Sequence, residues 1–168
     1  QGQLIRVRHI TPGDAAQLVD IFDHMSSNSR YMRFNRSLDS VVPDRVWQEA
    51  TQIVAVDTDK KEGLLAFADL PDDPETAVGA VRFVETSPGE AEVAISLRDD
   101  FQNMGIGTEL MHMLAREARD LGYVILTASI RNDNPAIWRV FNSLPYEVVR
   151  TPEGSLSDIT IRLDRPRQ

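Results

Sequence analysis

The chain has 168 residues, a length that fits one domain with a substantial buried core. Hydrophobic residues make up 42% and charged residues 26%, a composition that excludes wholesale disorder. The net charge of −8 argues against broad binding to nucleic acid or anionic membranes and favours cationic partners, and no apolar run is long enough for a membrane span. The absence of cysteine excludes a thiolate nucleophile and suits a cytoplasmic protein. We expect a single domain over residues 1–168, excised from a longer chain because the sequence lacks an initiator Met.

The hydrophobic pattern predicts strands and helices along the whole chain. A first strand over residues 4–10 places Ile5, Val7 and His9 on one face, and a helix begins at residues 11–14 with Thr11 as its cap. Short helical segments are predicted over 29–34 and 43–50, followed by strands over 53–56, 64–68, 77–85 and 91–97, with a turn over 57–63. The last third predicts a helix over 106–121, a strand over 123–128, a helix over 135–143 and strands over 147–150 and 159–163. Short links in the middle and crossovers later favour an α+β fold with a mixed, largely antiparallel sheet.

The most informative segment is the stretch from Glu90 to Leu110, where a strand runs into a turn and two glycines open an amphipathic helix. Backbone amides at a helix start form an anion site suited to a pyrophosphate, and Gly105 and Gly107 would let the backbone approach the phosphates closely. The dinucleotide-binding fingerprint is excluded because it needs a third glycine. The nucleotide-triphosphate loop is excluded because no lysine follows Gly107.

Two motifs resemble those of the GNAT superfamily of acyl-CoA-dependent N-acyltransferases. Gln102-Asn103-Met104-Gly105-Ile106-Gly107 is similar to the family's pyrophosphate signature, and the segment from Asn134 to Tyr146 is similar to its second conserved segment, with Tyr146 in the place of the family's Phe. The resemblance implies a GNAT fold, with a sheet of about seven strands flanked by helices in the order β-α-α-β-β-β-α-β-α-β-β. Residues 64–68 would then be an extra strand.

The segment Ser26–Phe34 resembles the corresponding stretch of Pat-type bacterial protein lysine acetyltransferases. This resemblance implies transfer of an acetyl group from acetyl-CoA to a lysine of a protein substrate, and an acyl-CoA synthetase is a candidate for that substrate. It also implies a possible fused regulatory domain, because such domains accompany the GNAT domain in those proteins.

The resemblance assigns roles to residues around the glycine motif. Glu92, ten positions before Gln102, is the expected general base that removes the amine proton, and Glu90 is the runner-up on the same strand face. The backbones of Ile95, Ser96 and Leu97 would pair with the pantetheine arm of acetyl-CoA. Asn134 would either contact pantetheine or cap a helix. The pyrophosphate would be bound by the amides of Gln102, Asn103, Met104, Gly105, Ile106, Gly107 and Thr108.

One position departs from the family pattern and keeps other functions open. Many GNAT enzymes carry a tyrosine as general acid where this chain has Phe141, and Pro145 replaces a usual glycine. Acetylation of a small-molecule amine and a non-catalytic acyl-CoA-binding sensor are therefore alternatives to protein lysine acetylation. His9, His24 and His112 show no metal-ligand spacing, so we expect no metal cofactor.

Overall fold

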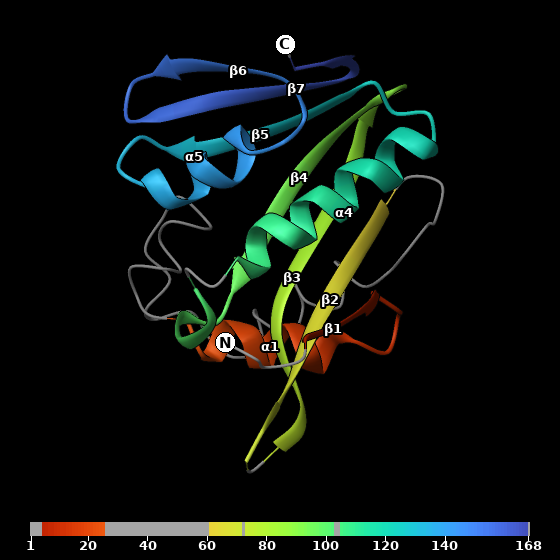
Figure 1. The fold of residues 1–168 in the computed structure, drawn as a ribbon, viewed down its shortest axis with the longest axis vertical. Helices are drawn as coiled ribbons and strands as arrows, with labels where there is room; N and C mark the ends of the chain where they lie inside the picture. The colour runs from red at the N-terminus through yellow and green to blue at the C-terminus, as the bar shows by residue number, and fades with distance from the viewer. Residues whose placement is uncertain (1–4, 26–60, 72, 103–104, 168) are drawn as a thin grey trace.

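The computed structural model describes residues 5–25, 61–71, 73–102 and 105–167. These residues form a seven-stranded sheet in the order β1-β2-β3-β4-β5-β7-β6, with helices on both faces (Figure 1). The predicted fold class, a mixed and largely antiparallel sheet of the GNAT type, is confirmed. The predicted helices over 29–34 and 43–50, the predicted strand over 53–56 and the segment 26–34 lie outside the described residues.

Every pair of neighbouring strands is antiparallel except β4 and β5, which run parallel. The long β2–β3 and β6–β7 hairpins account for much of the sheet, as expected where short links join consecutive strands. The strands are β1 (Ile5–His9), β2 (Lys61–Leu70), β3 (Asp73–Ser87), β4 (Glu90–Leu97), β5 (Ile125–Arg131), β6 (Tyr146–Glu153) and β7 (Leu156–Pro166).

Two strands differ from the prediction. The strand predicted over residues 64–68 is confirmed but is longer than expected, because it is the centre of β2, which pairs with both β1 and β3. The expected turn over 57–63 is wrong at its end, because β2 already begins at Lys61. The strand predicted from Tyr123 begins at Ile125 instead, because Gly122 adopts a φ of 99° and the amide of Tyr123 still bonds to the carbonyl of Ala118 in the preceding helix.

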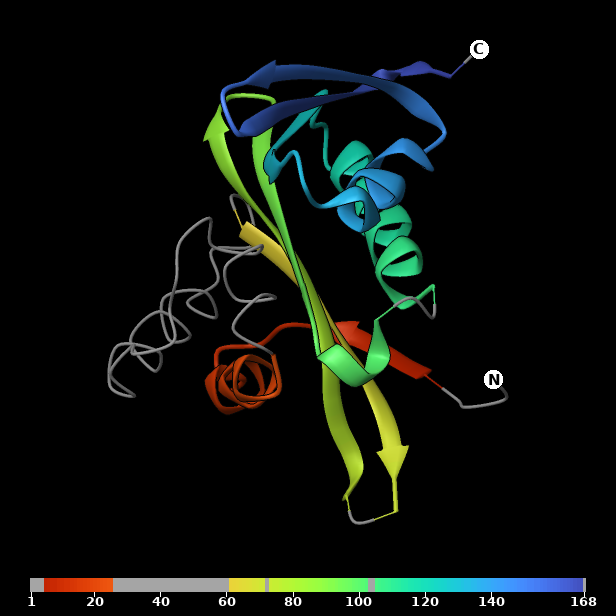
Figure 2. The ribbon, with the colours of Figure 1, turned by 90° about the vertical axis from the view of Figure 1, so that its left-hand side faces the viewer.

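The helices divide between the two faces of the sheet (Figure 2). Helices α4 (Ile106–Asp120) and α5 (Pro135–Asn142) cover one face, and α1 (Ala15–Asp23) covers the other. A single 3₁₀ turn, η1 (Asp99–Phe101), follows β4. The buried face of α4 follows the predicted helical spacing, with Ile106, Gly107, Leu110, Met111, Leu114, Ala115 and Ala118. No helix in the described ranges is long and apolar enough to cross a bilayer.

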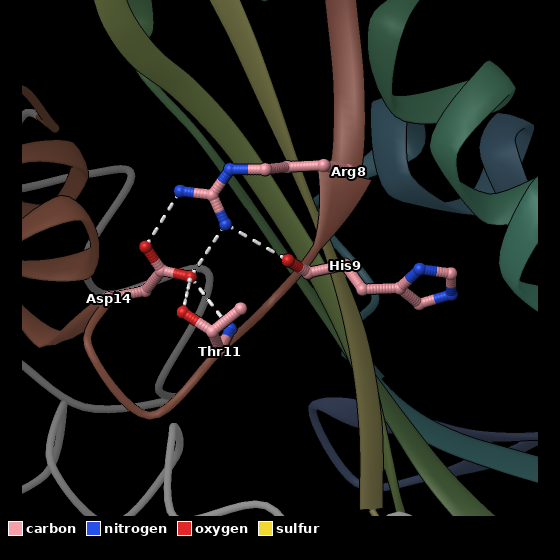
Figure 3. Close-up of polar contacts among 4 residues, drawn as sticks. All are labelled: Arg8, His9, Thr11 and Asp14. Atoms are coloured by element: carbon pink, nitrogen blue, oxygen red, sulfur yellow. Dashed lines mark hydrogen bonds and ion pairs between the residues drawn. The ribbon is translucent and has the colours of Figure 1, made fainter.

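The start of α1 is held by a polar cluster rather than by a Thr11 cap (Figure 3). The helix begins at Ala15, and the buried carboxylate of Asp14 accepts hydrogen bonds from the amide of Thr11 at 2.7 Å and its hydroxyl at 2.9 Å. Arg8, which lies over the Phe67 ring, donates two 2.8 Å hydrogen bonds to the same carboxylate. Asp14 thus fastens β1 to the entry of α1. The predicted capping role of Thr11 was wrong because Thr11 is a donor to Asp14.

The Arg8–Asp14 pair predicts a pH-dependent part of the stability. Hydrogen bonds from Arg8, opposed by burial and aided by Thr11, lower the pKa of Asp14 to about 2 from an ordinary 3.8. A depressed folded-state pKa contributes stability that is present above pH 4 and is lost as the pH falls from about 4 to 2. We expect Asp14→Asn to lower the free energy of unfolding at pH 7 by about 1–3 kcal/mol. In urea titrations, the difference from wild type should shrink steadily as the pH falls below 4.

Asp69→Asn is the matched control, because Asp69 accepts from Arg6 in a similar pair that is exposed to solvent. An exposed pair contributes about 0–1 kcal/mol, so this variant should stay close to wild type. Equal losses in the two variants, or a loss in Asp14→Asn that does not change with pH, would contradict the assigned role of Asp14.

Candidate functional site

β4 and β5 separate in the middle of the sheet. Their parallel pairing covers Glu90, Ala91 and Glu92 of β4 opposite Ile125, Leu126 and Thr127 of β5, and stops there. Both strands continue, β4 to Leu97 and β5 to Arg131, each still paired with its outer neighbour. Within the described ranges, the residue pairs between β4 and β5 therefore do not extend to the stretch of β4 from Val93 to Leu97. The edge of such a stretch offers backbone donors and acceptors to a ligand.

The predicted pantetheine residues all lie on the part of β4 that extends beyond its pairing with β5. Ile95, Ser96 and Leu97 are half-buried, and their side chains alternate between the two faces of the sheet. Ile95 and Leu97 pack against the core beneath α4, whereas Ser96 lies on the face that α1 covers. The side chains of Ile95 and Leu97 are therefore used in packing. What this stretch can offer a ligand is its backbone N–H and C=O groups.

The connection from β4 to α4 is anchored before it reaches the helix. Gln102 donates from its side-chain amide to the carbonyl of Leu97 at 3.4 Å and to the carboxylate of Asp99 at 3.3 Å. The amide of Asp99 bonds to the carbonyl of His24 at the end of α1, and Phe101 is buried. Asn103 and Met104, two of the predicted pyrophosphate residues, lie outside the described residues.

The start of α4 has the geometry of an anion site. Gly105 precedes the helix with φ 83°, a left-handed conformation that suits glycine, and nothing lies within 4 Å of where its Cβ would be. The amides of Ile106, Gly107 and Thr108 belong to the first turn, where helical amides have no acceptor within the helix. Together with the helix dipole they present partial positive charge at the open end of β4.

Gly107 is tightly packed at its α-carbon, and its predicted phosphate contact, which its amide would make, stays a prediction. It is buried, and a Cβ there would lie 3.1 Å from Cδ1 of Leu97, 3.2 Å from Cδ1 of Ile95 and 3.8 Å from Cγ2 of Val140. Its α-carbon thus faces β4 and α5 rather than a bound phosphate. The glycine allows α4 to pack closely on the part of β4 that extends beyond its pairing with β5.

Glu92, the predicted base, occupies the last residue pair before the strands separate. Its side chain is exposed and, by alternation from the buried Ala91 and Val93, lies on the face opposite α4. Glu90 shares that face but lies two residues, about 7 Å, further from the separation. We call the point where β4 and β5 separate the vertex. Position therefore favours Glu92 over Glu90 as the group that a substrate would meet at the vertex.

The aromatic residues near α5 are part of the core. Phe141 is only 1% exposed, and Tyr123 and Tyr146 are both buried. The Tyr123 hydroxyl donates to Glu85 at 3.1 Å. Asn134 accepts a hydrogen bond from the amide of Ile137 and so caps α5, which confirms the second of its two predicted roles. Its side-chain NH₂ is a separate donor group.

A surface hollow of about 510 Å³ runs along the outer side of α4. Thr108 is the one predicted site residue among the described residues of its lining, which also includes His112, Arg116 and Arg119. Arg116 lies ten residues into α4, about 15 Å from the helix start, so it is remote from the amides of the first turn. The sequence gives no signal for this hollow. One wall is α4, and the other is formed by β7 and the turn before β6, which are distant from α4 in the chain.

Comparisons with known proteins agree with this geometry. Residues 5–146 match the family model for the acetyltransferase (GNAT) domain. The GNAT domain of PAT from S. lividans superposes with a TM-score of 0.78 at 25% identity, covering 94% of this chain and 90% of that one. YncA from Salmonella typhimurium, a putative acetyltransferase solved with its cofactor acetyl-CoA, has a TM-score of 0.67 at 22% identity, covering 95% and 94%. The PaiA N-acetyltransferase from Thermoplasma acidophilum, solved with coenzyme A, has a TM-score of 0.71 at 14% identity, covering 95% and 99%.

The buried position of Gly107 predicts a packing defect on substitution. Gly107→Leu forces a side chain against Ile95 and Leu97, and overpacking of this kind costs about 1–3 kcal/mol. We expect a lower midpoint in urea denaturation. Ala136→Leu in α5 adds a similar side chain at an exposed helical position and should leave the midpoint nearly unchanged. If Gly107→Leu is as stable as Ala136→Leu, the packing role is wrong.

Proposed function

Because the chain belongs to the GNAT acetyltransferase family, we propose that it transfers the acetyl group of acetyl-CoA to the side-chain amine of a lysine in a protein substrate, with Glu92 as the general base. The observation that carries the proposal is that the end of the β4–β5 pairing, the first turn of α4 and Glu92 lie around one strand separation. The acetyl-CoA complex of YncA, which shares the fold, supports this choice of acyl donor.

We propose that acetyl-CoA lies along β4 with its pantetheine arm against the backbone of Ile95, Ser96 and Leu97. The pyrophosphate then meets the amides from Gln102 to Thr108, where the start of α4 favours a negative charge. The Asn134 side chain keeps an NH₂ group that can donate to a pantetheine carbonyl while its oxygen caps α5. This arrangement brings the thioester toward the vertex near Glu92.

The reaction requires a neutral amine, and free lysine has a pKa of about 10.4. In the proposed step, Glu92 accepts a proton from the lysine ammonium, directly or through one water, and the neutral nitrogen then attacks the thioester carbon and forms the C–N bond. The attached nitrogen loses its second proton by the same route through Glu92 to solvent, and the C–S bond breaks to release CoA as a thiolate. Because Glu92 is exposed at the vertex, a lysine carried on another protein's surface can reach it.

The protein substrate is proposed from two features. The similarity to the GNAT domain of S. lividans PAT favours a Pat-type activity, and the net charge of −8 favours an acceptor surface that is basic. An acyl-CoA synthetase is the first candidate substrate to test. A panel of small amines tested alongside it distinguishes the small-molecule alternative. Acetyl-CoA binding without CoA release on any acceptor would favour the non-catalytic sensor.

The binding site predicts an effect of charge at Gly105. Gly105→Glu places a carboxylate in open space beside the proposed pyrophosphate amides, so the affinity for acetyl-CoA should fall by about tenfold or more. Isothermal titration calorimetry measures this. Gly122→Glu is the matched control, because Gly122 also has a positive φ and open space but lies past the other end of α4. Both variants bear similar backbone strain, so equal affinities would overturn the assignment.

The general base predicts a loss of turnover without a loss of binding. Glu92→Gln keeps the size of the side chain but cannot accept the proton, so turnover should fall about 10²–10⁴-fold near neutral pH. The affinity for acetyl-CoA should barely change. Raising the pH should partly restore turnover, because more of the amine is already neutral. A coupled assay of CoA release measures both effects.

Glu90→Gln is the control for Glu92→Gln, because it makes the same change on the same strand face further from the vertex. Its turnover should remain near that of wild type. A large loss in Glu90→Gln with normal turnover in Glu92→Gln would move the role to Glu90. Normal turnover in both would remove the carboxylate base from the mechanism.

A further inference from the structure

Three side chains converge on the α4 face of β1, away from the strand separation. His9 ends β1, Glu62 lies at the start of β2 and Glu117 lies near the end of α4. Nε2 of His9 is 2.8 Å from Oε1 of Glu117 and 3.6 Å from Oε1 of Glu62, and one ligand atom of each residue lies within 4.8 Å of the other two. His9 points away from the Arg8–Asp14 pair, on the other side of the strand (Figure 3).

The cluster has an excess of negative charge and unsatisfied oxygens. The side chains of Glu62 and Glu117 are 21% and 31% exposed, and the two carboxylates share one imidazole. The second oxygen of each, Oε2, is buried and has no hydrogen-bond partner among the described residues. A buried carboxylate oxygen without a partner is costly, so the geometry favours a cation between the three groups.

We propose that His9, Glu62 and Glu117 form a binding site for Zn²⁺. One imidazole nitrogen and two carboxylates are donors that zinc accepts, at about 2.0–2.2 Å from the metal. Tetrahedral coordination at that radius separates the donors by about 3–4 Å, close to the two distances from His9, so little rearrangement is needed. Mg²⁺ and Ca²⁺ prefer six or more oxygens, which these three residues do not supply. A water completes the coordination.

The site would fasten the edge of the sheet to α4. Among the described strands β1 lies at the edge and pairs with β2, and its residues Ile5 and Val7 contact the core beneath α4. A metal held by β1, β2 and α4 adds a link between these elements. Glu117 lies eleven residues, about 16 Å, along α4 from its first residue. The proposed metal is therefore structural, outside the acetyl-transfer site and independent of the proposed function.

The test is titration of the chelator-treated chain with ZnCl₂. Calorimetry should give one Zn²⁺ per chain, and zinc at 100 times its dissociation constant should reduce the unfolding equilibrium constant about 100-fold, seen as a higher melting temperature. MgCl₂ should have no such effect. His9→Gln and Glu117→Gln should each weaken zinc binding about tenfold or more. His24→Gln should not, because the His24 ring bonds to the carbonyl of Asp20 on α1.

Circular dichroism of each variant without metal shows whether it remains folded, so that binding is compared between folded proteins. Glu62→Gln is a further variant if either of the others fails to fold. No zinc binding by the wild-type chain would overturn the proposal, as would equal binding by wild type and by folded His9→Gln. Weakening only in His24→Gln or His112→Gln would place the metal elsewhere and would also overturn it.

Discussion

β4 and β5 run parallel for three residue pairs and then diverge, while each keeps its outer neighbour to its end. The connection between them is α4, so the helix must begin near the end of β4 and finish near the start of β5. The first turn of α4 therefore lies beside the part of β4 that extends beyond its pairing with β5. This single parallel contact therefore places the edge of β4 and the start of α4 around one opening. Ligand sites in open α/β sheets likewise lie at the ends of strands.

Packing on both faces holds this opening in place. On the sheet-facing side of α4, residues such as Leu110, Met111 and Leu114 are fully buried. Gly107 allows the first turn of α4 to approach Ile95 and Leu97. On the other face, the carbonyl of His24 at the end of α1 accepts from the amide of Asp99, the first residue of η1. The loop that carries the proposed pyrophosphate site is thus tied to elements on both sides of the sheet. Such support fixes backbone donors before a ligand arrives.

Periodicity and glycine chemistry predicted much of this fold, because both are local properties of the sequence. The alternation that placed Ile5, Val7 and His9 on one face is confirmed by their contacts on the α4 side. The separation of β4 from β5 could not be predicted from the sequence. It changes which strand lies beside β4, and it does not change the residues that form β4 or β5. The α-carbon of Gly107 faces the core because of how α4 packs on β4 and α5. The sequence does not show this packing, so it suggested only a phosphate contact.

Non-local contacts account for the other misses. The sequence places Asp14 at the start of a helix, but it does not show that the Asp14 carboxylate is bound by Arg8 from the preceding strand. The proximity of His9, Glu62 and Glu117 also had no sequence signal, because they come from three elements far apart in the chain, and the metal there stays a proposal. The single-domain boundary and its excision from a longer protein stay predictions.

The buried aromatic residues bear on how the proposed reaction would end. Phe141 has no proton to donate, Tyr146 is buried, and Tyr123 donates to Glu85, so in the described part of the chain no tyrosine is arranged as an acid for the leaving sulfur. A thiol has a pKa of about 8.5 and an alkylammonium about 10.4, so a thiolate is the better leaving group once the attacking nitrogen has lost its proton. Before that loss, the protonated nitrogen leaves more readily than the sulfur. The proton taken by Glu92 would therefore decide the direction in which the tetrahedral intermediate collapses, and a side-chain acid for the sulfur would not be needed.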